Sequence, residues 1–152
     1  MTNKWAKIYF TALLFWLWAS ASQAETALVT PEEALLPPSP VLTQRGPPDG
    51  PKVELTGPDS GVASGTPFSL SAVFKPRPET SIDPNSVHII LLRGDGVDVT
   101  ERVRTAGRID QTGIDLKGLQ APPGEYRIRV LVDDTSSRPG FADITLKIDA
   151  PH

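Results

Sequence analysis

The chain has 152 residues, a formal net charge of −3 and no cysteine. A mild acidic excess without a clustered basic face argues against nucleic-acid binding. The lack of cysteine excludes disulfide bonds and thiolate metal sites, and it removes the residue that a bacterial lipoprotein needs directly after its leader.

Residues 1–24 have the three-part layout of a secretory signal peptide. Two lysines precede an uncharged, mostly apolar run over residues 8–18, and small residues follow as far as Ala24. This pattern predicts cleavage before Glu25 and export to a bacterial periplasm or to the exterior. A helix over the apolar run rises only about 16 Å, against the roughly 30 Å of a membrane core, which favours a cleaved leader over the alternative of an uncleaved membrane anchor. No membrane span is expected after cleavage.

Residues 25–51 contain seven prolines. Proline fixes φ and lacks an amide donor, so we expect this range to be an extended, disordered tether. Such a tether is a stalk, a ligand for a proline-binding groove, or a segment with no partner. Its leucine and valine residues are more apolar than a spacer needs, so docking of some of them on the following domain stays open.

From Lys52 onward short strands alternate with turns rich in glycine and proline, which predicts one domain over residues 52–150. A brief turn or helical segment is expected over residues 98–103. Recurrent turns at intervals of about 8–12 residues favour an all-β, antiparallel sandwich of seven strands. The clearest strands, each with apolar residues at alternate positions or on both faces, are 52–56, 67–75, 87–93, 113–117, 125–133 and 141–149.

The stretch L-Q-A-P-P-G-E-Y-R-I-R-V at residues 119–130 resembles the approach to the sixth strand of immunoglobulin-like and fibronectin type III-like domains. The run I-D-P-N-S-V at 82–87, followed by G-V-D-V-T at 96–100, is similar to bacterial immunoglobulin-like modules of secreted and surface proteins. The resemblance implies that Tyr126 forms a tyrosine corner, with its hydroxyl bonded to nearby backbone. The resemblance also implies an immunoglobulin-like fold and a role in binding or as a spacer. It carries no catalytic residues. The chain lacks the cysteine pair and the core tryptophan of antibody-type domains.

Residues suited to catalysis are scarce. His88 and His152 are the only histidines, and no serine elbow or cysteine accompanies them. Two distant histidines also make a poor zinc or copper site. We therefore expect no enzyme activity and no cofactor.

Calcium is harder to dismiss, because it needs only oxygen ligands. One aspartate opens the approach to the expected third strand, two close the sixth strand and two flank a glycine turn, although none matches an EF-hand loop. The alternative is that they form turns and caps. The candidates are Asp83, Asp95, Asp98, Asp133 and Asp134.

The outward face of the third, sixth and seventh predicted strands is the best candidate for a binding surface, because these strands share one sheet in this fold class. We expect an apolar centre with a basic rim, a combination that marks interaction sites. Two alternatives are that leucine and valine residues of the tether cover this face, or that the third strand is buried on both faces. The surface consists of Ile90, Leu92, Arg127, Arg129, Leu131 and Lys147.

Together these features predict an exported, non-catalytic, immunoglobulin-like module that binds another protein. The partner and the oligomeric state are not readable from the sequence. Two other functions remain open: an accessory module that supports a periplasmic enzyme or metal-handling system, and a calcium-stabilised adhesive or spacer domain.

Overall fold

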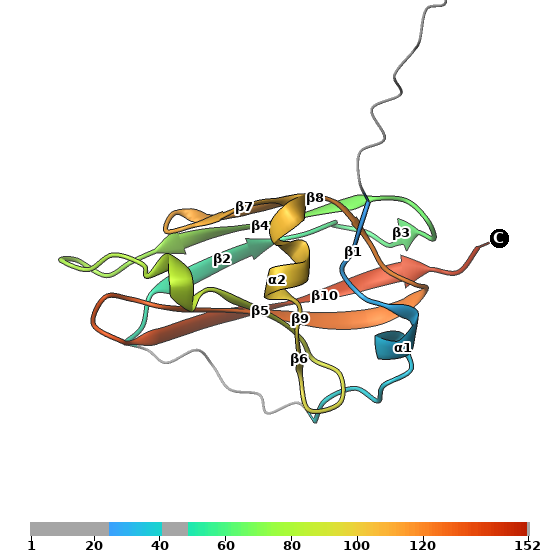
Figure 1. Cartoon of the computed structure of the whole chain (residues 1–152), viewed down its shortest axis with the longest axis horizontal. Coiled ribbons are helices and arrows are strands. Elements are labelled where there is room, and N and C mark those ends of the chain that lie inside the picture. Colours follow the sequence, from blue (N-terminus) through green and yellow to red (C-terminus); the bar gives the residue numbers. More distant parts are fainter. Residues whose placement is uncertain (1–24, 41–48, 152) are drawn as a thin grey trace, which may run out of the picture.

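The structure is a computed structural model that describes residues 25–40 and 49–151. Its strands form two layers that face each other (Figure 1). The predicted signal peptide lies outside the described residues. The strands are β1 (Thr26–Ala27), β2 (Lys52–Thr56), β3 (Val62–Ala63), β4 (Phe68–Lys75), β5 (His88–Leu91), β6 (Val97–Asp98), β7 (Gly107–Asp110), β8 (Gly113–Gln120), β9 (Gly124–Asp133) and β10 (Pro139–Asp149). The helices are α1 (Pro31–Ala34) and α2 (Thr100–Val103), and the 3₁₀ turns are η1 (Pro84–Ser86) and η2 (Arg104–Ala106).

The first sheet is built on β2, β4 and β8, which pair antiparallel in that order. Because β4 occupies one edge of β8, two short strands share the other edge. Strand β7 pairs antiparallel with residues 113–116 of β8, and β1 pairs in parallel with Leu119 and Gln120.

The second sheet has the order β3-β10-β9-β5-β6. Strands β5, β9 and β10 are the predicted third, sixth and seventh strands, and they lie side by side as expected. Short β3 runs parallel to the end of β10. One sheet of β2, β4, β8 and β7 against another centred on β5, β9 and β10 is the strand arrangement of an immunoglobulin-like sandwich. The predicted all-β sandwich of immunoglobulin-like type is therefore confirmed, but it is not purely antiparallel, because β1 and β3 pair in parallel.

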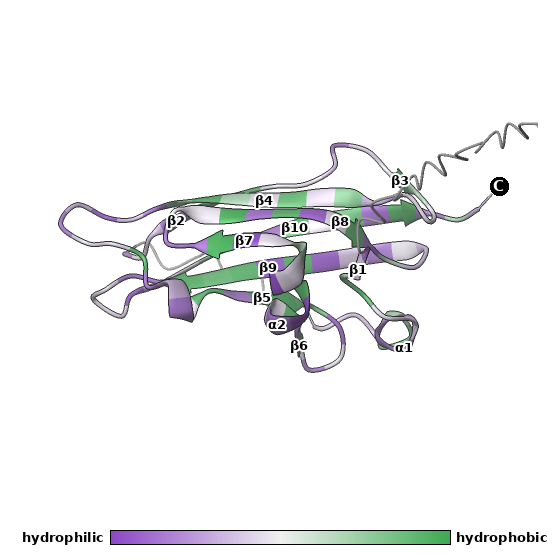
Figure 2. Cartoon of the chain, turned by 45° about the horizontal axis from the view of Figure 1, so that its top comes forward, coloured by the Kyte–Doolittle hydropathy of each residue, from purple (hydrophilic) through white to green (hydrophobic). Residues whose placement is uncertain are grey.

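The core lies between the two sheets and follows the period-two alternation of the strands. In β4 the buried residues are Phe68, Leu70, Ala72 and Phe74, and the residues between them face outward. Figure 2 shows this alternation as bands of changing hydropathy along β4. Each large side chain buried in this way contributes about 1.5–3 kcal/mol of hydrophobic free energy.

Residues 25–40, the N-terminal arm, differ from the disordered tether expected for residues 25–51. Strand β1 extends the first sheet, and Leu28 and Val29 are fully buried in the core. At the other end of the arm, Pro38 forms a bridge with Arg93 beside the second sheet. The arm thus passes from one layer to the other (Figure 1). Val41 and Leu42, which were expected to be able to dock, lie outside the described residues.

The prolines of the arm occupy positions where no amide donor is needed. Pro31 opens α1, where the first N–H groups of a helix have no partner in any case. Pro37 uses only its carbonyl, which accepts the N–H of Gly94 at 2.8 Å. Proline is tolerated at sheet edges for the same reason. The expectation of a tether was wrong here because proline content excludes sheet interiors and leaves edges and helix starts open.

An ion pair fastens the arm to α2. Arg102 donates from Nη1 to Glu33 Oε1 at 2.9 Å and from Nη2 to Oε2 at 2.8 Å, and Nη2 also donates to the carbonyl of Leu28. Thr30 and Glu33 form a reciprocal capping box at the start of α1. Burial by itself would raise the pKa of Glu33, but the bonds from Arg102 and from the backbone of Thr30 outweigh it and lower that pKa.

The strand count also differs from the expected seven, because the described residues hold ten strands. The four that the sequence pattern missed are β1, β3, β6 and β7, each two to four residues long. A run this short shows no readable alternation, which is why these strands were overlooked. The short helical segment expected over 98–103 is present as α2. Within the described ranges, no helix has the length and apolar character needed to cross a membrane.

Candidate functional site

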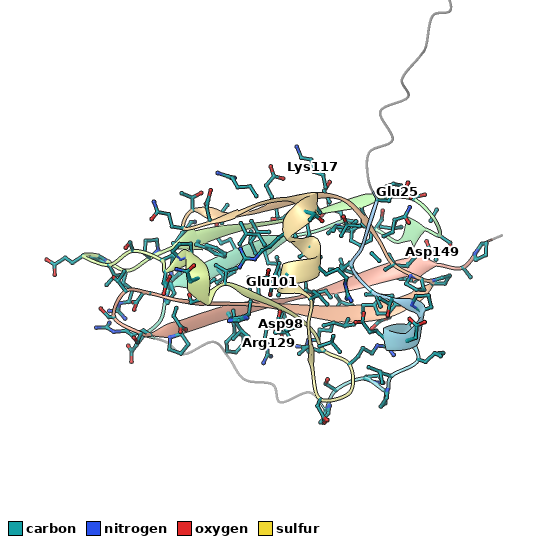
Figure 3. The ribbon with its side chains drawn as sticks, in the orientation of Figure 1. Glu25, Asp98, Glu101, Lys117, Arg129 and Asp149 are labelled. Carbon is teal, nitrogen blue, oxygen red and sulfur yellow. The ribbon has the colours of Figure 1, made fainter. Side chains whose placement is uncertain are left out.

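The outer face of the second sheet carries all six residues predicted to form a partner surface. Strand register sets them in rows, since directly paired residues point to the same side. Ile90 lies opposite Arg129, and Arg129 lies opposite Asp143 on β10. The neighbouring row joins Leu131 to Phe141. Figure 3 shows Arg129 and Asp98 along this lower layer, with Lys117 on the far side of the upper layer.

A carboxylate at the centre of this face binds two arginines. Arg129 donates from Nε to Asp143 Oδ1 at 2.7 Å and from Nη2 to Oδ2 at 2.9 Å. Arg127 Nη2 lies 3.1 Å from the same Oδ2. The hydrogen bonds that Arg129 donates to Asp143 raise the pKa of Arg129 against the opposing effect of burial. The guanidinium of Arg129 also lies 4.3 Å from the ring centroid of Phe141, within the range of a cation–π contact.

The apolar part of the surface is half-buried. Ile90, Leu92 and Leu131 each keep some exposure, and Phe141 joins them. The backbone of Leu92 is bonded on both sides: its N–H donates to Arg127 and its carbonyl accepts the N–H of Ser39. The arm therefore borders this surface along one side. Lys147 stands further out, with Nζ 3.9 Å from an oxygen of Asp149.

A cavity of about 470 Å³ opens where the arm meets the outer face of the second sheet. Its walls come from both parts of the chain, with prolines on the arm and three arginines on or beside the strands. The residues that matter for its chemistry are Pro38, Pro40, Leu92, Arg93, Arg127 and Arg129.

Arg93 lines this cavity and is held in place by main-chain carbonyls. Its Nη1 donates to Leu36 at 2.8 Å, and its Nη2 donates to Glu125 at 2.7 Å. The guanidinium also lies 5.1 Å from the ring centroid of Tyr126. Among the described residues Arg93 makes no ion pair, and its hydrogen bonds go to main-chain carbonyls.

Tyr126 has the geometry that the resemblance implies. Its ring is buried, and its hydroxyl donates to the carbonyl of Pro122 at 2.9 Å. Burial raises the pKa of Tyr126 against the effect of Arg93, so the hydroxyl keeps its proton at neutral pH. Gly124 is required beside it: its φ is +148°, and a Cβ there would lie 3.1 Å from the hydroxyl oxygen.

His88 lies on the outer face at the end of a short polar chain. Its Nδ1 is 2.7 Å from Asp98 Oδ2, and Asp98 Oδ1 accepts the N–H of Thr100 at 2.9 Å. Burial alone would raise the pKa of Asp98, but the hydrogen bonds from Thr100 and His88 outweigh it and lower that pKa. An oriented imidazole of this kind resembles part of a catalytic triad, but a triad also needs a nucleophile at the other ring nitrogen. The hydroxyl of Thr100 donates to Asp98 Oδ1 and accepts the N–H of Ile89. It therefore bonds the carboxylate partner of His88 and does not take the place of the nucleophile in a triad.

Three of the aspartates considered for calcium, Asp83, Asp133 and Asp134, come together through their backbones and not through their carboxylates. Asp83 N–H donates to the carbonyl of Asp133, and Ile82 forms a bridge with Asp134. Adjacent strand residues point to opposite faces, so Asp133 and Asp134 diverge. The carboxylate of Asp134 accepts the N–H groups of Ser136 and Arg138 in the β9–β10 turn. In the part of the chain that the structure describes, no group of three or more His, Cys, Asp or Glu residues could hold a metal ion.

Three residues of this face were missed by the sequence interpretation. Phe141 and Asp143 follow from the same alternation that placed Lys147 outward, so extending it along the whole seventh strand would have found them. Arg93 could not be found in that way, because it lies beyond the end of β5 and is oriented by the arm.

No protein-family model matches the chain, and no curated protein sequence matches it. One solved structure that it resembles is the PKD domain of an M14-like peptidase from Thermoplasmatales archaeon SCGC AB-540-F20, at 16% identity over 66% of this chain and 97% of that chain, with a TM-score of 0.46. Another is murine CRIg, at 12% identity over 66% of this chain and 98% of that chain, with a TM-score of 0.39. The assignment of an immunoglobulin-like fold rests on the strand order and register described above.

Proposed function

We propose that this chain is an exported, non-catalytic, immunoglobulin-like module that binds a protein partner through the outer face of the second sheet. The signal-peptide pattern of residues 1–24 supports export to a periplasm or to the exterior. Among the described residues the first strand is β1, which begins at Thr26.

One observation carries the proposal: the two outer faces differ in how their charges are held. On the first sheet the ion pairs are solvated, and the Lys117 and Asp115 side chains are 73% and 48% exposed. On the second sheet the Lys147–Asp149 pair is solvated as well, but the Arg129 and Asp143 side chains are only 17% and 15% exposed. An ordered, partly desolvated ion pair beside exposed apolar atoms resembles the composition of interface cores, where arginine and aromatic residues are enriched.

The test is cross-linking in intact cells followed by mass spectrometry, with two variants of matched chemistry. Leu131→Glu places a charge in the proposed surface, while Val73→Glu places the same charge at a 52% exposed valine on the outer face of the first sheet. We expect Leu131→Glu to remove the partner's cross-link and Val73→Glu to keep it, with similar melting temperatures for both.

Retention of the cross-link by Leu131→Glu would contradict the proposal, as would its loss in Val73→Glu alone. If Leu131→Glu does not fold, Arg127→Glu tests the same surface, because that side chain is 35% exposed and its loss leaves the core untouched. An Arg127→Glu variant that folds and still captures the partner would likewise contradict the proposal.

A further inference from the structure

The cavity between the N-terminal arm and the second sheet concentrates positive charge. Arg93, Arg127 and Arg129 all line it. Asp143 is the carboxylate that bonds two of these arginines, and Glu125 is an exposed residue in the lining. Among the residues that the structure describes, three guanidinium groups therefore share one half-buried carboxylate and one solvated one.

The three arginines differ in how many of their donors are already used. Arg129 is bonded to both oxygens of Asp143 and stacked on Phe141. Arg93 is bonded to carbonyl oxygens, which hold its position without offsetting its charge. Within residues 25–40 and 49–151, the one side-chain contact of Arg127 is 3.1 Å long, with an oxygen of Asp143 that already accepts a hydrogen bond from Arg129. Of the three arginines, Arg127 therefore has the most N–H donors left for a ligand.

From this geometry we infer that the cavity binds a carboxylate of an acidic, extended segment on the protein partner, with Arg127 as its principal donor. The inference rests on the proposed function and names the chemistry of the partner. A guanidinium fork matches the two oxygens of a carboxylate and forms short, charge-assisted bonds with it.

The walls of the cavity fit a glutamate or aspartate side chain. Pro38, Pro40 and Leu92 present apolar atoms that can contact the methylene groups below a carboxylate. A dense polyanion fits poorly, because Glu125 stands in the lining and the chain as a whole carries a net charge of −3. The arrangement therefore favours one or two carboxylates on a peptide over a nucleic acid.

The probe is a fluorescein-labelled peptide of alternating glutamate and alanine, with its glutamine counterpart as the control ligand. Binding to the purified protein is followed by fluorescence anisotropy. We expect the glutamine peptide to bind about tenfold or more weakly, and Arg127→Gln to reduce affinity for the glutamate peptide by a similar factor, as for loss of a charged hydrogen bond. Asp143→Asn should strengthen binding, because it removes the competing carboxylate.

Lys117→Gln is the matched control, because it removes one positive charge from the opposite face of the molecule. It should leave the affinity unchanged. Equal binding of the two peptides, no loss in Arg127→Gln, or an equal loss in Lys117→Gln would each overturn the inference. Circular dichroism of each variant verifies that the compared proteins are folded.

Failure here is distinguishable from failure of the proposed function. Suppose that the glutamate peptide does not bind while Leu131→Glu still removes the partner's cross-link. The inference that the cavity binds a carboxylate is then wrong, and the proposed partner surface is still supported. If the peptide binds through Arg127 while Leu131→Glu keeps the partner, the cavity stands and the proposed partner surface is wrong.

Discussion

The N-terminal arm and the strand-rich body from residue 49 onward are held in the fold by different means. In the body, long strands place an inward side chain at every second position, and hydrophobic burial is spread over many residues. In the arm only Leu28 and Val29 are fully buried. The rest of the arm is fixed by edge hydrogen bonds and by the Glu33–Arg102 pair.

This difference shows what proline content reports about a segment. Prolines exclude a strand interior because they lack the N–H that a ladder needs, but an edge requires donors on one side only. The arm occupies such edges in both sheets, at β8 through β1 and beside Arg93 through Pro38. Covered edges are also protected from pairing with another chain.

The largest expected effect comes from Leu28→Ala, compared with Leu70→Ala in β4. Both leucines are fully buried, so each truncation should cost about 2–5 kcal/mol through lost burial and the cavity left behind. The free energy of unfolding is measured by urea denaturation. Similar losses would show that the arm unfolds together with the body.

A small loss for Leu28→Ala beside a large loss for Leu70→Ala would contradict that expectation. The arm would then open separately, as a local unit of lower stability. Hydrogen exchange of the Leu28 amide, which donates to Gln120 at 2.8 Å, reports such opening directly.

A smaller effect is expected from Glu33→Gln, which keeps the shape of the side chain and removes its charge. The two charge-assisted bonds to Arg102 and the capping box are weakened together, and we expect a cost of about 2 kcal/mol. Urea denaturation measures it, with Glu32→Gln as the control because Glu32 is exposed in the same turn. An equal cost for both variants would contradict a specific role for Glu33.

The same pair gives a dependence on pH. Because the folded-state pKa of Glu33 lies below its ordinary value of 4.5, its contribution to stability is full above that value and is lost as the pH falls through the folded-state pKa. The protection of the arm amides from hydrogen exchange, taken relative to the intrinsic exchange rate at each pH, should therefore fall on acidification in the wild-type protein. It should fall less in Glu33→Gln. Identical acid profiles in the two proteins would show that the ionised Glu33 does not hold the arm.

The body could be predicted from the sequence because each of its long strands repeats the same rule. In β9 the four inward residues Tyr126, Ile128, Val130 and Val132 are buried as the alternation predicts. The same alternation predicts the six residues of the proposed partner surface, because the positions between inward residues of a strand point outward.

The arm and the cavity could not be predicted in this way, because their geometry depends on pairs far apart in the sequence. Glu33 meets Arg102 and Leu36 meets Arg93, and neither pairing leaves a local pattern. Aspartates that appeared grouped in sequence, such as Asp133 and Asp134, point to opposite faces for the same reason that adjacent strand residues always do.

The smallest expected effect is that of Tyr126→Phe, which tests the body without disturbing the arm. The substitution removes only the hydroxyl that donates to Pro122, and we expect a cost of about 1 kcal/mol in the free energy of unfolding. The aromatic ring under Arg93 is retained, so the contact of that arginine with the ring should persist. Hydrogen exchange at Ser39, whose N–H donates to Leu92, should therefore match the wild type once global stability is taken into account. An unchanged free energy of unfolding would mean that the hydrogen bond of the hydroxyl makes no net contribution to stability. Faster exchange at the Ser39 amide would mean that the arm depends on the tyrosine corner as well as on its own contacts.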